Sequence, residues 1–216
     1  MAKGFMTYLV VAILIGLAIF LFVGKIAADV FQIGTRTTSS FNTLIETMKN
    51  IKNNGNQESV AFIFDNDKNA LLGFAPNAPR LEWIIVSNTN EDVVRYTPRP
   101  DAALCPKDKS CLCVCGEITL GQKDLSCTGK LTCQSLDTVQ IADYTYISKI
   151  PGGAVAKNYY WKNGFAVIRS SEFPQGYIDL GVAMKDNLKG VYVAKEAGKI
   201  SVCGKSDCRV GSPFSP

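Results

Sequence analysis

The sequence predicts an α+β protein in which a long amino-terminal helix, first transmembrane and then amphipathic, precedes a mainly antiparallel β domain stapled by disulfides. Residues 5–24 contain no charged side chain, and a stretch of this length spans a bilayer as a helix. Apolar residues then continue at helical spacing. From residue 59 onward, short β-rich runs alternate with turn residues, and all eight cysteines lie in this part of the chain.

The first residues define the predicted membrane segment. Residues 1–4 form a short basic leader or cytoplasmic head, and residues 5–24 would make a helix about 30 Å long, which matches the hydrocarbon core of a bilayer. We therefore interpret 5–24 as a transmembrane helix. The competing interpretation is a secretory signal peptide cleaved after Ala28. Such peptides usually have a shorter apolar core, and Lys25 lies between this core and the cleavage site.

Residues 25–53 are predicted to continue the helix as an amphipathic extension. Apolar residues three, four or eight positions apart keep one helical face apolar. They are Ile26, Val30, Ile33, Phe41, Leu44, Met48 and Ile51. The sequence Asn53-Asn54-Gly55 is a stop signal, so the predicted rod is about 70 Å long. Its apolar face packs on the protein's own body or meets the same helix in neighbouring copies.

Residues 59–216 are predicted to form an extracellular β-rich domain. Runs at 60–64, 71–74 and 81–86 are rich in β-forming residues, and acidic turn residues and prolines separate them.

Later in the chain we expect two hairpins and a ribbon. The first hairpin spans 159–168 around Lys162-Asn163-Gly164, and the second spans 177–194. The ribbon spans 200–210, where a disulfide between Cys203 and Cys208 could close it.

The cysteines predict a disulfide framework. They are Cys105, Cys111, Cys113, Cys115, Cys127, Cys133, Cys203 and Cys208. Cys111, Cys113 and Cys115 alternate, so in a strand they share one face and are poorly placed to bond one another. Each should pair across strands or with Cys105, Cys127 or Cys133, and the sequence leaves the pairing open.

Metal binding is the competing interpretation of these cysteines. The spacings are C-x5-C, C-x-C-x-C, C-x5-C and C-x4-C, which lack the C-x2-C knuckles of zinc sites, and the chain has no histidine. We therefore expect disulfides and no metal.

The side of the membrane follows from the cysteines rather than from charge. Lys3 lies on one flank of the apolar segment, and Lys25 and Arg36 are opposed by Asp29 on the other, so the positive-inside comparison is nearly balanced. Many cysteines indicate an oxidising compartment, which places the body outside the cytoplasm. The net charge of +4 is spread along the chain, so we expect no nucleic-acid partner.

Enzymatic residues are scarce. Without histidine there is no Ser-His or Cys-His pair, and no phosphate loop, serine elbow or Rossmann fingerprint is present. Glu91 and Asp92 are interpreted as a solvated turn rather than an acid/base pair. We expect no enzyme and no cofactor.

Aromatic residues gather in two of the predicted strands. They are Tyr144, Tyr146, Tyr159, Tyr160 and Trp161. Aromatics that alternate along strands are usually core residues or cross-strand pairs, and a ligand platform is the alternative.

The head of the chain carries a resemblance. A basic residue and a glycine, Lys3-Gly4, precede Phe5 and the apolar segment, and a β-rich, cysteine-bearing body follows. This order resembles type IV pilins and pilin-like proteins, including archaeal ones. The resemblance implies cleavage between Gly4 and Phe5 by a prepilin-type peptidase. Many pilins carry glutamate at the fifth mature position, where this chain has Leu9.

The resemblance implies a pilin-like structural subunit of a type IV-like cell-surface filament or of its assembly apparatus. Its partners would be the membrane and other copies of itself or other pilin-like subunits, joined through the amino-terminal helix. The small residues Ala12, Gly16 and Ala18 would let neighbouring helices approach closely. The alternative is a monomeric, single-pass membrane-anchored surface protein whose β domain binds a ligand or adheres to a surface.

Overall fold

The computed structural model describes residues 39–54, 56–64, 68–87, 90–150, 157–168, 190–204 and 209–211. The predicted leader, the apolar segment and the start of the extension lie outside these residues. So do the predicted processing and helix-packing residues, which are Lys3, Gly4, Phe5, Ala12, Gly16 and Ala18.

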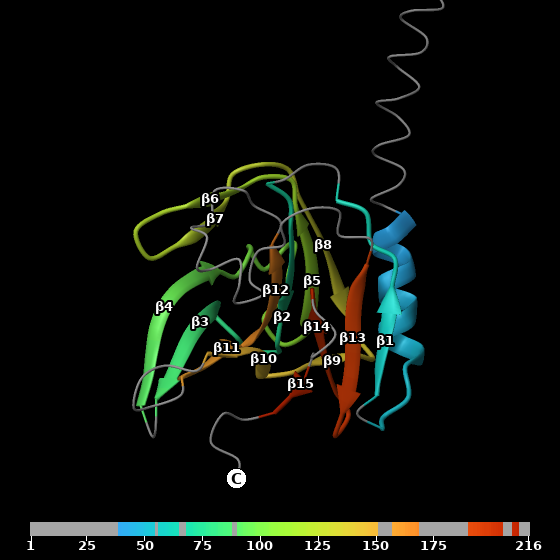
Figure 1. Cartoon of the computed structure of the whole chain (residues 1–216). Coiled ribbons are helices and arrows are strands. Elements are labelled where there is room, and N and C mark those ends of the chain that lie inside the picture. Colours follow the sequence, from blue (N-terminus) through green and yellow to red (C-terminus); the bar gives the residue numbers. More distant parts are fainter. Residues whose placement is uncertain are drawn as a thin grey trace, which may run out of the picture. The chain divides into compact units, whose positions relative to one another are not determined.

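The predicted α+β class, with its long amino-terminal helix, is wrong. Strands make up most of the described chain, and helix occurs there only at residues 39–50 (Figure 1). No helix in the described part is long and apolar enough to cross a membrane. The prediction joined apolar positions from 26 to 51 into one rod because their spacing fitted. Spacing alone does not prove a continuous helix, and the stripe is buried at positions 41, 44, 48 and 51 of the described part.

Residues 40–216 are assigned to one compact unit, and the described residues of this unit form three larger sheets and a small ribbon. The central sheet has the order β12 (Gly164–Ile168), β2 (Ala70–Phe74), β5 (Ser110–Cys115), β8 (Leu131–Leu136). The helix-side sheet has the order β1 (Gln57–Val60), β13 (Val191–Glu196), β14 (Lys199–Cys203), β9 (Gln140–Ile141). The aromatic sheet has the order β15 (Arg209–Val210), β10 (Tyr144–Ile150), β11 (Lys157–Lys162), β3 (Arg80–Ser87), β4 (Asn90–Pro98). The ribbon pairs β6 (Ile118–Leu120) with β7 (Leu125–Cys127).

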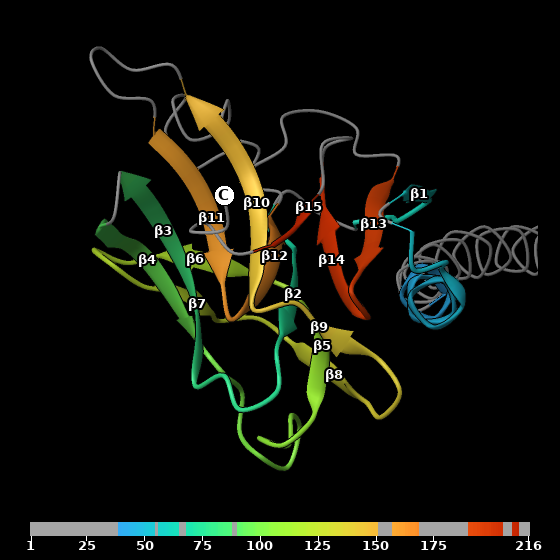
Figure 2. The ribbon, with the colours of Figure 1, turned by 90° about the horizontal axis from the view of Figure 1, so that it is seen from below.

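Strands β12, β2 and β5 of the central sheet are buried on both faces because neighbouring elements cover them from two sides, whereas β8 at the edge is partly exposed (Figure 2). β2 and β12 are buried at every residue, and both are continuous runs of apolar residues and glycine. Alternate side chains enter two separate apolar clusters. The helix cluster joins the helix and the helix-side sheet to Leu71, Leu112, Phe165 and Val167. The cystine cluster joins the cysteines and the aromatic sheet to the opposite face of the central sheet.

The helix is held by its apolar face. Phe41, Leu44, Ile45 and Met48 recur at helical spacing and are all buried in the helix cluster, whereas Glu46 on the opposite face is exposed. In the described residues, therefore, the apolar stripe packs on the protein's own body.

The predicted hairpin over 159–168 is wrong in its pairing. A tight turn does occur, with positive φ at Asn163 (68°) and Gly164 (140°), but β11 pairs with β10 and β3, while β12 pairs with β2. Asn163 is a corner between sheets, because its N–H donates to Asp143 O (2.5 Å) and its carbonyl accepts from Ala75 N–H (2.9 Å).

The predicted ribbon over 200–210 is also wrong. β14 pairs with β13 and β9, whereas β15 pairs with β10. The hairpin in this region is β13–β14, which turns at Ala197 and Gly198 with φ of 49° and 78°. Two successive positive φ values suit the tight turns that join twisted antiparallel strands. The strand expected at 177–184 lies outside the described residues.

Candidate functional site

Disulfides dominate the chemistry of the domain. Cys105 bonds Cys111, Cys113 bonds Cys133, and Cys115 bonds Cys127. Cys203 is also disulfide-bonded, and the predicted Cys203–Cys208 pairing falls on a residue outside the described part, Cys208. No free cysteine occurs in the described part of the chain. The prediction of a disulfide framework is therefore confirmed for residues 105–133.

The alternation of cysteines along β5 explains the arrangement. Cys111, Cys113 and Cys115 point to the same face of β5, toward the aromatic sheet, and each is fully buried. None bonds another member of the trio, as the spacing predicts. The Sγ atoms of Cys111 and Cys113 are only 3.6 Å apart, so two disulfides lie in contact within the core.

Arg99 organises the loops beside these disulfides. Its guanidinium donates five hydrogen bonds of 2.6 to 3.2 Å, all to backbone carbonyls, and it lies 5.7 Å from the ring centre of Phe74. The acceptors are the carbonyls of Ala75, Ala78, Cys105, Pro106 and Lys109. Burial lowers the pKa of Arg99, and the charge of Asp108 partly offsets this effect. Arg99 thus ties the end of β2 to the loop that carries Cys105.

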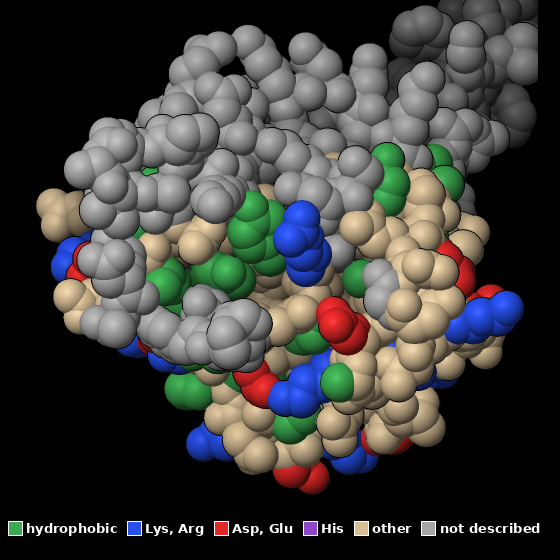
Figure 3. Space-filling model, turned by 60° about the horizontal axis from the view of Figure 1, so that its bottom comes forward, with side chains coloured by type: hydrophobic (Ala, Val, Ile, Leu, Met, Phe, Trp, Pro, Cys, Tyr) green, Lys and Arg blue, Asp and Glu red, His purple; other side chains and the backbone are tan. Residues whose placement is uncertain are grey.

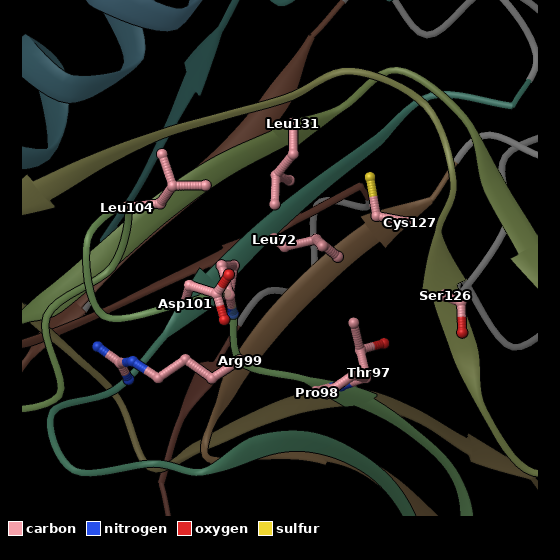
Figure 4. Close-up of a pocket in the computed structure, with 10 residues that line it drawn as sticks. Leu72, Thr97, Pro98, Arg99, Asp101, Leu104, Ser126, Cys127 and Leu131 are labelled. Atoms are coloured by element: carbon pink, nitrogen blue, oxygen red, sulfur yellow. The ribbon is translucent and has the colours of Figure 1, made fainter.

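A pocket of about 280 Å³ lies next to Arg99, between the end of β4, β2, β7 and β8 (Figure 4). Its apolar side chains come from Leu72, Leu104 and Leu131, with Cys127 beside them. Leu104 is 47% exposed, so its side chain is accessible from solvent. Thr97, Asp101 and Ser126 also line the pocket.

The polar groups of the pocket are few and mostly engaged. Ser126 Oγ donates to Asp124 Oδ2 (2.7 Å). The guanidinium of Arg99 donates to backbone carbonyls of the neighbouring loops. Thr97 Oγ1 is buried and has no hydrogen-bond partner in the described part of the molecule. Because three leucines make up most of the apolar lining, the pocket can accept a small group that is largely apolar.

The aromatic residues divide between the two faces of the aromatic sheet. Tyr159 and Trp161 lie 6.4 and 6.3 Å from Trp83 and belong to the cystine cluster, as the core interpretation predicts. Tyr146 and Tyr160 form an edge-to-face pair at 5.5 Å and are only partly buried. Arg209 stacks 5.3 Å from the ring of Tyr146.

Glu91 is not part of a solvated turn, so that interpretation is wrong for this residue. It lies in β4, where Tyr144 Oη donates to Oε1 (2.9 Å) and Lys162 Nζ donates to Oε2 (2.5 Å), and only 18% of its side chain is exposed. Burial and then the hydrogen bond to Glu91 raise the pKa of Tyr144, and the hydrogen bond to Glu91 raises the pKa of Lys162. Asp92, its neighbour, is exposed.

Charged side chains are dispersed on the surface in Figure 3, where basic and acidic groups alternate with apolar and uncharged ones. Several charged side chains of the described residues are paired, as in Lys109 with Asp137 (2.7 Å) and Arg80 with Glu82 (2.7 Å). A basic stripe of the kind that binds nucleic acid is not visible on this face.

The described residues therefore define a class: a three-sheet, nearly all-β domain with its disulfides inside the core. Comparison with protein-family models, with curated proteins and with solved structures finds no match to this chain.

Proposed function

We propose that this chain is a pilin-like structural subunit of a type IV-like cell-surface filament or of its assembly apparatus. In this proposal the apolar segment 5–24 anchors the chain in the membrane before assembly and then joins it to other copies or to other pilin-like subunits. The β domain lies outside the cytoplasm. The observation that carries the proposal is the buried disulfide framework of the body, which follows a pilin-like head.

The disulfides support an exported body. Cys105, Cys111, Cys113 and Cys115 have no exposed surface, and their bonds join β5 to β7, to β8 and to the loop before β5. Disulfides built into a core in this way persist in an oxidising compartment and are rare in the cytosol.

The polar groups support a structural role. Arg99 bonds five backbone carbonyls, and Glu91 bonds Tyr144 and Lys162, so these partly buried charges stabilise the domain itself. A subunit of a filament needs a durable body of this kind.

Filament formation tests the proposal. Ala12 and Gly16 are four residues apart, a spacing that lets apolar helices approach closely. Gly16→Leu should therefore abolish filaments, and so should the charge introduced by Ile13→Asp. Gly16→Ala, which keeps the residue small, is the matched control and should retain filaments. Electron microscopy of surface material decides the matter, and filaments that persist in Gly16→Leu and Ile13→Asp would overturn the proposal.

A second candidate function is favoured by the pocket: a monomeric, membrane-anchored surface protein whose β domain binds a small apolar group. Leu104→Asp should then weaken binding of an apolar fluorescent probe about tenfold or more, because a carboxylate would enter the apolar lining. Val93→Asp is the control, since Val93 is also exposed (39%) but does not line the pocket. Equal binding by both variants would exclude the pocket as the site.

A further inference from the structure

Three cysteine sulfurs lie together between the central sheet and the loop before β5, and a fourth is bonded to one of them. The Sγ atoms of Cys105, Cys111 and Cys113 all lie within 4.8 Å of one another, and Cys133 is bonded directly to Cys113. The first three residues are fully buried, and Cys133 is partly buried. Reduction of these two neighbouring disulfides would therefore release four thiols close to one another.

After reduction of the disulfides, the distances between these sulfur atoms would be close to those in a tetrahedral zinc–thiolate site. Zn²⁺ binds four thiolates tetrahedrally at about 2.3 Å, which places the ligand sulfurs about 3.8 Å apart. Cys111 and Cys113 already lie 3.6 Å apart. Cys113 and Cys133 are directly opposite each other on β5 and β8, so their side chains remain neighbours after reduction.

We propose that the chain, when its disulfides are reduced, binds one Zn²⁺ ion through the thiolates of Cys105, Cys111, Cys113 and Cys133. This site goes beyond the proposed structural function and does not depend on it. The metal form and the disulfide form exclude each other, because the same four sulfur atoms make both.

Charge balance independently favours the site. A Zn²⁺ ion with four thiolates carries two negative charges, which are costly to bury without a cation nearby. Arg99 supplies one, since its Nε donates to the carbonyl of Cys105 at 3.2 Å. Arg99 forms no salt bridge within the described residues, but the charge of Asp108 also acts on it, so Arg99 would offset only part of the negative charge of the site.

The chemistry balances in two steps. Each disulfide takes up two electrons and two protons from a dithiol reductant, which is oxidised to its own disulfide, and two disulfides thus give four thiols. Zn²⁺ then displaces the four thiol protons into solvent as four Zn–S bonds form. In vitro a phosphine replaces the dithiol and is oxidised to its oxide, with water supplying oxygen and protons.

Cobalt provides a direct readout. The full chain in detergent is reduced with a phosphine without oxygen and titrated with Co²⁺, which reports tetrahedral thiolate ligation by sulfur-to-cobalt charge-transfer bands and intense visible bands. We expect these bands to saturate at one equivalent and to disappear when Zn²⁺ is added. Absence of the bands, whether or not the reduced chain stays folded, would overturn the proposal.

Variants assign the ligands. Cys113→Ser and Cys105→Ser should each lose the four-thiolate spectrum. The double variant Cys115→Ser/Cys127→Ser is the matched control, because it removes the neighbouring disulfide and leaves the four proposed ligands. It should keep the spectrum at one equivalent. A control that loses the spectrum, or a Cys113→Ser variant that keeps it, would show that the metal is bound elsewhere and contradict the site.

Discussion

The two faces of the central sheet are stabilised in different ways. On one face the helix cluster consists of aliphatic and phenylalanine side chains and contains no cysteine. On the other face the cystine cluster combines tryptophans with disulfides, and Arg99 fastens the loops beside it. The continuous apolar faces of the regular elements thus pack together without a disulfide inside the helix cluster. The loop-rich side, between β4 and β8, has fewer such faces and is held by covalent bonds and buried hydrogen bonds.

Reduction of the disulfides should lower the free energy of unfolding more than any other change, and it should act mainly on the side of the cystine cluster. Each disulfide typically contributes about 2–4 kcal/mol to the free energy of unfolding, so loss of the three between residues 105 and 133 should destabilise the domain severely. Hydrogen exchange of the chain reduced in the presence of a chelator should show faster exchange in β5 to β8 before the helix at 39–50. If β5 to β8 and the helix lost their protection from hydrogen exchange at the same time, the two clusters would not be stabilised separately.

Truncation of a side chain in the helix cluster should have the second-largest effect on the free energy of unfolding. Leu44 has no exposed surface, so Leu44→Ala should lower the free energy of unfolding by about 3 kcal/mol through lost burial and a residual cavity. Glu46→Ala, on the exposed face of the same helix, should change it by less than about 0.5 kcal/mol. Chemical denaturation of the oxidised protein measures both. Similar values for the two variants would mean that the helix does not pack as described.

Arg99→Lys should have a smaller but localised effect. Lysine keeps the charge but cannot donate to five carbonyls in a planar arrangement, so several buried acceptors lose their partners. We expect a loss of about 2 kcal/mol, with faster hydrogen exchange in the segments 75–78 and 104–109. Arg95→Lys is a control, because Arg95 donates to the carbonyl of its own neighbour Val94.

Alkaline pH should produce the smallest effect, through Glu91, Tyr144 and Lys162. Folding raises the pKa of Tyr144 and of Lys162 above their ordinary values of 10.0 and 10.5. Their contributions are therefore fully present below these values and are lost as the pH rises through the higher folded-state pKa values. Lys162→Met should flatten this alkaline loss, which we expect to amount to under about 1 kcal/mol. A free energy of unfolding that does not fall as the pH rises above about 10, or that falls as steeply in Lys162→Met as in the wild type, would contradict this account.

Sequence reasoning succeeded where local spacing determines the structure. The alternation of Cys111, Cys113 and Cys115 was sufficient to predict that they share a face and do not bond one another. The turn at Asn163 and Gly164 was also predictable, because both residue types tolerate a positive φ. Its strands nevertheless enter different sheets, since local turn chemistry does not specify the partner of a strand.

The rest required the three-dimensional structure for physical reasons. Arg99 gave no signal in the sequence because its acceptors are backbone carbonyls, which every residue has. Glu91 meets Tyr144 and Lys162 from 53 and 71 residues away, so its local surroundings suggested a solvated turn. The predicted long helix failed because apolar spacing records which side of a segment is buried and not how far the helix continues.

The central claim, that the chain is an exported pilin-like subunit, is tested most directly by mass spectrometry of filaments sheared from the cell surface, alkylated without a reductant. The account predicts that this chain is a component of the filaments, that its mature form begins at Phe5, and that the cysteines from Cys105 to Cys133 are unmodified because they are oxidised. Filaments that lack the chain, or a surface form that begins after Ala28 and carries alkylated cysteines, would contradict it.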